Sequence, residues 1–135
     1  MPVCTVNGIS QIVWSPLAQG VLTGKYLPGK LPPADSRAVS KTMNSFFGED
    51  LRNDRILAAV QNLKPIADGL GITMAQLALA WVLRQADVAS AIVGASRPQQ
   101  VTDNCRASGV KLDDAALQAI DSVLMPVVAT FGRPQ

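Results

Sequence analysis

Apolar residues recur at helical spacing through the middle of the chain. Thr73 and Gln76 have the spacing of a capping box, and residues 74–84 are apolar on nearly every side, which is typical of a buried helix. A second helix is predicted over residues 53–70, with a kink at Pro65 because proline removes one backbone hydrogen bond. Steps of four, three and four residues place on one face of this helix Ile56, Val60, Leu63 and Ala67.

Two short extended runs and two further helices complete the pattern. Residues 11–14 (Gln-Ile-Val-Trp) predict a short buried strand, which ends before a proline that cannot donate to a sheet. Residues 89–93 predict a second strand. A helix is predicted over residues 98–107 with Ser96 as its cap, and a last helix is expected to begin after Asp113.

Residues 28–50 have no hydrophobic period and are rich in Pro, Gly, Ser and charged residues. A loop of this length is either a functional lid or a disordered segment, and the sequence leaves both alternatives open. Phe46 and Phe47 would anchor it if it packs into a pocket. Residues 125–135 are expected to form a loose tail. Because two strands do not make an independently stable sheet, the predicted strands require further partners.

Composition narrows the class of protein. The 135 residues correspond to a single domain, 1–135, of which 48% is hydrophobic and only 16% charged. A net charge of +2 is too small to indicate nucleic acid or an acidic membrane as partner. Cys4 and Cys105 lack the paired spacing of a zinc or disulfide framework. The chain has no long apolar run and no basic segment followed by an apolar one, so we expect a soluble cytoplasmic protein without a signal peptide.

Both predicted strands lead into loops that suit an anion. After the first strand, the loop offers exposed backbone N–H groups, the Ser15 hydroxyl and the Lys25 cation. After the second strand, Gly94 permits close backbone approach, and Ser96 and Arg97 stand at the start of a helix. Helix N-termini attract negative charge, and an arginine fork matches phosphate geometry. Taken alone, Ser96-Arg97-Pro98 is also an ordinary helix start, and Lys25 and Arg97 could be solvated charges, so these residues leave a phosphate site as one of two alternatives.

The two loops also carry a resemblance. Residues 14–26 (Trp-Ser-Pro-Leu-Ala-x-Gly-x-Leu-Thr-Gly-Lys-Tyr) resemble the loop after the seventh barrel strand of the aldo-keto reductases. Residues 92–104 resemble the family's eighth strand, with the loop and helix that hold the 2′-phosphate and adenine of NADP(H). The resemblance covers about residues 2–124. It implies an α/β fold, a mostly helical partial (β/α)8 TIM barrel comprising the last two strand–helix units plus extra helices, in a truncated chain.

The resemblance assigns roles to individual residues. It places Ser96 and Arg97 on the 2′-phosphate, Gln100 and Asn104 near the adenine, and Trp14 beside the nicotinamide half. It also places the long loop at 28–50 over the cofactor. The full set of cofactor-binding residues that it implies is Trp14, Ser15, Pro16, Leu17, Gly20, Lys25, Gly94, Ser96, Arg97, Gln100 and Asn104.

Catalytic residues cannot be assigned in the same way. The family reduces carbonyl groups with a tyrosine, a lysine, an aspartate and a histidine on earlier strands, whereas this chain has no histidine and one tyrosine, Tyr26. Tyr26 matches a cofactor-loop position. Two functions therefore stay open: NADPH-dependent reduction of a small aldehyde or ketone, or a non-catalytic oligomeric remnant or nucleotide-binding module. In either case the high apolar content predicts a homo-oligomer.

A rival interpretation comes from residues 66–79, which imitate a helix-turn-helix with glycine in the turn. A recognition helix must expose residues that hydrogen-bond to bases. The second helix here offers only Gln76 and Arg84. DNA binding is therefore disfavoured.

Overall fold

The computed structural model of the protein describes residues 2–40, 42 and 53–128. This part of the chain is a mostly helical α/β fold with a two-stranded parallel sheet. In chain order the elements are α1 Pro2–Val6, β1 Gln11–Trp14, the 3-10 helices η1 Ala18–Thr23 and η2 Arg37–Val39, α2 Asp54–Gln61, α3 Lys64–Gly69, α4 Met74–Leu83, β2 Val88–Ile92, α5 Pro98–Cys105, the 3-10 helix η4 Arg106–Gly109 and α6 Asp114–Val128.

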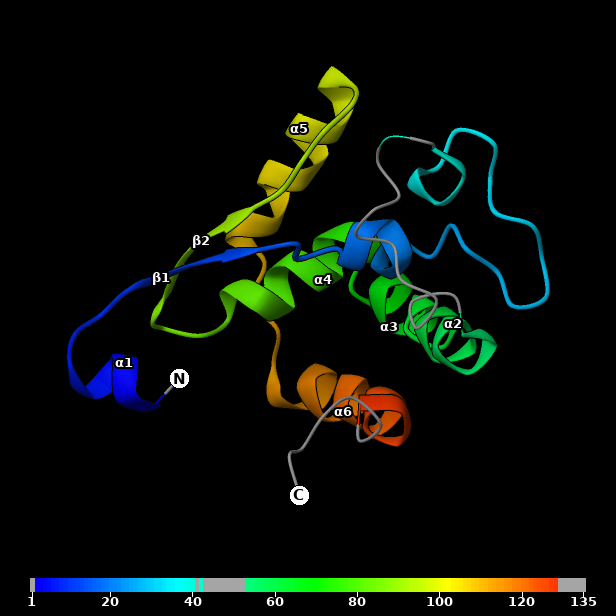
Figure 1. Ribbon diagram of the computed structural model, residues 1–135. Helices are drawn as coiled ribbons and strands as arrows, with labels where there is room; N and C mark the ends of the chain where they lie inside the picture. The colour runs from blue at the N-terminus through cyan, green and yellow to red at the C-terminus, as the bar shows by residue number, and fades with distance from the viewer. Residues whose placement is uncertain (1, 41, 43–52, 129–135) are drawn as a thin grey trace.

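The sheet brings two distant parts of the sequence side by side (Figure 1). β1 has the predicted bounds, and β2 begins and ends one residue earlier than predicted. The strands run parallel with Trp14 opposite Ile92, and the register is irregular between Gln11 and Ile12. Because parallel strands end at the same edge of a sheet, the loops that follow β1 and β2 lie at one end.

The prediction that β1 is buried is wrong for one of its two faces. Ile12 and Trp14 are 68% and 69% exposed, and Ile92, which shares their face, is 62% exposed. Val13 and Ala91 alternate with them and are half-buried. The reason is that α4 packs against one side of the sheet, whereas among the described residues no element covers the other side. Parallel sheets are normally covered on both faces.

The helices carry the hydrophobic core. One cluster joins α3, α4 and α6 and contains the buried residues Leu63, Ala67, Leu77 and Ile120. A second cluster joins the loop after β1 to α2 and contains Val21, Tyr26, Ala38, Leu57 and Val60. Ala38 comes from the long loop at 28–50, so this loop contributes to the core at that point, whereas its Leu31 is 94% exposed. Phe46 and Phe47 lie outside the described residues.

The helix predicted over residues 53–70 is two helices rather than one kinked helix. α2 ends at Gln61 and α3 begins at Lys64, so the break precedes Pro65. Pro65 occupies the first turn of α3, where its missing N–H removes no helical hydrogen bond. The apolar residues keep their helical spacing from α2 into α3, so the break could not be recognised from the hydrophobic pattern.

Two predicted helix starts are confirmed in atomic detail. Thr73 Oγ1 accepts a hydrogen bond from the Gln76 amide at 3.1 Å, and Gln76 Oε1 accepts one from the Thr73 amide at 3.0 Å. Asp113 Oδ1 accepts from the Ala116 amide at 2.8 Å at the start of α6. α6 continues through Pro126 to Val128. Of the tail expected at 125–135, the last seven residues lie outside the described part of the chain.

α4 is a buried structural helix. Gln76, one of the two residues that a DNA-reading helix would present, is 7% exposed, and its Nε2 donates to the Asp103 carbonyl at 2.8 Å. Within the described ranges, no single helix combines the length and hydropathy of a membrane span. Only α2–α3 taken together with α4 reaches those values, and an 88° bend separates the two parts.

Candidate functional site

The loop after β1 holds an unusual backbone conformation. Ser15, Ala18 and Gln19 have φ angles of 55°, 46° and 58°, in the left-handed region that side chains disfavour. Each non-glycine residue in this region destabilises the folded state by about 1–3 kcal/mol, and such residues cluster at ligand-binding segments. Pro16 is buried beneath them. Gln19 Nε2 donates to Ser15 Oγ at 2.9 Å, which holds the two ends of the turn together.

Gly20 makes room for the Lys25 side chain. Its φ is 96°, and a Cβ built at this position would lie 3.0 Å from Lys25 Cε and 3.2 Å from Nζ. The Lys25 ammonium also lies 5.2 Å from the centre of the Tyr26 ring, within the range of a cation–π interaction. The Leu17 carbonyl accepts from the Gly20 amide at 2.8 Å and so closes the turn. The glycine therefore positions a cation across the loop.

The loop after β2 is organised by Gln100 rather than by the predicted cap. Gln100 Oε1 accepts from the Ser96 amide at 2.8 Å, the Ser96 hydroxyl at 3.2 Å and the Arg97 amide at 3.3 Å. Arg97, with an extended backbone, occupies the N-cap position of α5, so the prediction of Ser96 as cap is wrong. Ser96, Arg97 and Gln100 are exposed, and Asn104 is half-buried farther along α5.

Arg37 joins the two loops, and sequence reasoning did not single it out. Arg37 Nη1 donates to Gln19 Oε1 in the first loop. Its Nη2 lies 3.4 Å from the position that a Cβ on Gly94 would occupy in the second loop. The guanidinium group of Arg37 therefore lies beside the backbone at Gly94. The segment around Arg37 has no hydrophobic period, so the available signal was the resemblance that placed residues 28–50 over the cofactor.

A second link runs from the same segment to the second loop. Arg97 Nη2 and Asp35 Oδ2 form an ion pair at 2.9 Å, with side chains 66% and 71% exposed. Asp35 was also missed from the sequence. Lys25, Arg37 and Arg97 thus place three cations around the loops at the carboxyl ends of β1 and β2. Lys25 lies against Gly20, Arg37 donates to Gln19, and Arg97 is the N-cap residue of α5.

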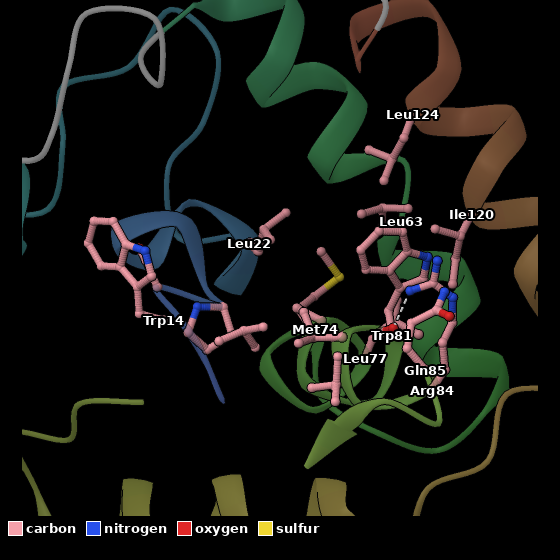
Figure 2. Close-up of a pocket in the computed structure, with 16 residues that line it drawn as sticks. Trp14, Leu22, Leu63, Met74, Leu77, Trp81, Arg84, Gln85, Ile120 and Leu124 are labelled. Atoms are coloured by element: carbon pink, nitrogen blue, oxygen red, sulfur yellow. Dashed lines mark hydrogen bonds between the residues drawn. The ribbon is translucent and has the colours of Figure 1, made fainter. Parts of the chain in front are cut away.

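A separate apolar cavity of about 520 Å³ lies on the helical side of the sheet. Figure 2 shows Met74 between Trp14 on one side and Trp81 on the other. The Arg84 guanidinium stacks 3.7 Å from the centre of the Trp81 ring. Burial lowers the pKa of Arg84, an effect that the Asp121 carboxylate opposes. The cavity meets the candidate site at residues 14–16, and Arg84 lines it from the end of α4.

A comparison with known families decides the relationship. The model of the Aldo/keto reductase family matches residues 1–125. The chain belongs to this family. Its α/β fold agrees, since the chain superposes on the glycerol dehydrogenase of Gluconobacter oxydans with a TM-score of 0.75 and 26% sequence identity. That match covers 99% of this chain and 39% of the dehydrogenase.

Two plant proteins that are similar to this aldo/keto reductase chain are described as potassium channel subunits. A "Probable voltage-gated potassium channel subunit beta" of Arabidopsis thaliana is 43% identical over 126 residues, which are 92% of this chain and 38% of that protein. A protein of the same description from Oryza sativa subsp. japonica is 42% identical over 110 residues, which are 82% of this chain and 33% of that protein. The chain therefore spans between a third and two fifths of the length of these relatives.

Proposed function

We propose that the chain binds NADP(H) at the carboxyl ends of β1 and β2, and that it is the cofactor-holding part of an aldo/keto reductase that reduces small aldehydes or ketones. The position of Arg37, which donates to Gln19 Oε1 in the first loop and lies beside Gly94 in the second, is the observation that carries the proposal. It brings two loops that are far apart in the sequence to one set of cations. A dinucleotide with several phosphates needs such a set.

The residues of the first loop fit the pyrophosphate of NADP(H). Lys25 and Arg37, with the Ser15 hydroxyl and the Leu17 backbone, are suited to the pyrophosphate, because positive charge and hydrogen-bond donors lie along this loop. The Gly20 amide is already used, since it donates to the Leu17 carbonyl. The Lys25 side chain occupies the space that a Cβ on Gly20 would need, so the cation lies directly against this loop.

Residues at the start of α5 and at the end of β1 are assigned to the other parts of the cofactor. Ser96 and Arg97 are suited to the 2′-phosphate, and Gln100 and Asn104 to the adenine. Trp14, followed by the buried Pro16, presents an exposed indole at the end of β1, where it would contact the nicotinamide half. When bound, the cofactor supplies the hydride for carbonyl reduction.

The place of the chain in a complete enzyme follows from the same assignment. β1 and β2 are proposed to correspond to the seventh and eighth strands of a (β/α)8 barrel, after which phosphate sites are common. The proton donor of the reaction is proposed to come from the portion of the relatives that this chain does not cover. The 135 residues contain no histidine, so that member of the family's catalytic set must lie elsewhere.

Nucleotide titration tests the proposal. NADPH and NADH are titrated separately against the purified chain by calorimetry, and NADPH is expected to bind more tightly. Arg97→Ala should remove that preference, whereas Arg106→Ala should keep it, because Arg106 forms another exposed ion pair, with Asp103 at 3.3 Å. Identical affinities for the two nucleotides in the unaltered chain would contradict the proposal. NADPH consumption with a panel of aldehydes and ketones then tests catalysis, with Tyr26→Phe as a check on the single tyrosine.

A further inference from the structure

The two arginines of the site have partners of different charge. Arg37 donates to the neutral amide oxygen of Gln19, so its positive charge is not cancelled. Arg97 is paired with the Asp35 carboxylate at 2.9 Å. A carboxylate and a phosphate bind the same face of a guanidinium fork. A phosphate can therefore be added at Arg37 without removing a negative group, whereas at Arg97 it meets one.

We propose that Asp35 sets the cofactor specificity of the site by competing with the 2′-phosphate of NADP(H) for Arg97. This inference rests on the proposed function, because it concerns the same cofactor site. NADP(H) must displace Asp35 from Arg97 or bind beside a like charge. NAD(H) has no 2′-phosphate and leaves the ion pair intact. Asp35 therefore reduces the preference for NADP(H) that Arg97 creates.

The backbone around Asp35 keeps the carboxylate near the site. The next residue, Ser36, is 3% exposed, and its amide donates to the Pro33 carbonyl at 2.9 Å. Arg37 is held by Gln19, and Ala38 is buried in the core. Since the segment is anchored on this side, a displaced carboxylate only rotates away from Arg97. Asp35 and the 2′-phosphate therefore compete for the same guanidinium group, that of Arg97.

The size of the effect follows from exposure. Both side chains of the pair are more than 60% exposed, so water screens them, and such pairs contribute little energy. Removing the competitor should therefore tighten NADPH binding by about two- to five-fold. The affinity for NADH should not change, because the Asp35–Arg97 pair does not contact a group that NADH carries.

The test uses Asp35→Asn in the full 135-residue chain, titrated by calorimetry with NADPH, NADH, 2′,5′-ADP and 5′-AMP. The variant should bind NADPH and 2′,5′-ADP two- to five-fold more tightly and the other two ligands as before. Asp68→Asn is the matched control, since it removes an exposed ion pair with Lys64 at 2.8 Å, away from the site, and should change none of the four affinities. In an Arg97→Ala background, Asp35→Asn should have no effect.

The outcomes distinguish failure of the Asp35 competition from failure of the proposed nucleotide site. If the unaltered chain binds NADPH but Asp35→Asn leaves its affinity unchanged, or tightens NADPH and NADH equally, the competition is refuted while the nucleotide site stands. If the unaltered chain binds none of the four ligands, the proposed function fails and this inference fails with it.

Discussion

Arg37→Ala should weaken the binding of NADPH and NADH by the same factor. The substitution removes the guanidinium group that donates to Gln19 Oε1 and lies beside Gly94, and with it one of the cations assigned to the pyrophosphate. Both cofactors carry the pyrophosphate, whereas only NADPH carries the phosphate assigned to Arg97. The two arginines should therefore give different patterns when each is replaced.

The magnitude can be worked from the contacts. A hydrogen bond to a charged group contributes about 1.5–3 kcal/mol, and each 1.4 kcal/mol is a factor of ten in affinity. Losing one phosphate contact of this kind should raise the dissociation constant by roughly 10- to 150-fold. Arg37→Lys should recover part of the loss, because lysine keeps the charge but lacks the fork that spans two loops.

Calorimetric titration of the two cofactors against Arg37→Ala, Arg37→Lys and the control Arg106→Ala measures these factors directly. Urea unfolding of each variant shows whether the fold is retained, so that lost binding is not mistaken for lost structure. Unchanged cofactor affinity in Arg37→Ala, with the fold intact, would refute the assignment of Arg37 to the pyrophosphate. A loss confined to NADPH would instead place Arg37 at the 2′-phosphate.

Two further predictions concern stability and assembly. Ile120→Ala should lower the free energy of unfolding by about 2–5 kcal/mol, because Ile120 is 2% exposed in the α3–α4–α6 cluster, and the exposed Gln118→Ala should change it by less than about 0.5 kcal/mol in the same urea experiment. We also propose that the chain self-associates through the open face of the sheet, so light scattering after size exclusion should show an oligomer that Ile12→Thr with Ile92→Thr weakens. A well-folded monomer of the unaltered chain at micromolar concentration would contradict this.

Features that depend on near neighbours in the sequence could be predicted from it. The start of α4 follows from Thr73 and Gln76, which are three residues apart, and the start of α6 follows from Asp113 in the same way. The bounds of β1 followed from an apolar run that ends before Pro16. These signals are local, because each side chain bonds to backbone within one turn.

Features that depend on distant segments could not be predicted. The exposure of Ile12 and Trp14 depends on which layers cover the sheet, and no local pattern encodes that. Likewise, the contact of Arg37 with Gln19 spans 18 positions, and that of Arg97 with Asp35 spans 62. The motifs identified the two loops, but only the fold reveals the segment that ties them together.

The pairing of β1 with β2 also has a consequence for the order of folding. Gln11 Nε2 donates to Asp87 Oδ2 across 76 positions of sequence, and closing a loop of that length costs about 4 kcal/mol of chain entropy. The contacts between α3 and α4 are nearer in sequence and should form sooner. Since both loops of the candidate site begin where these strands end, we expect the site to form only after this long-range pairing has closed.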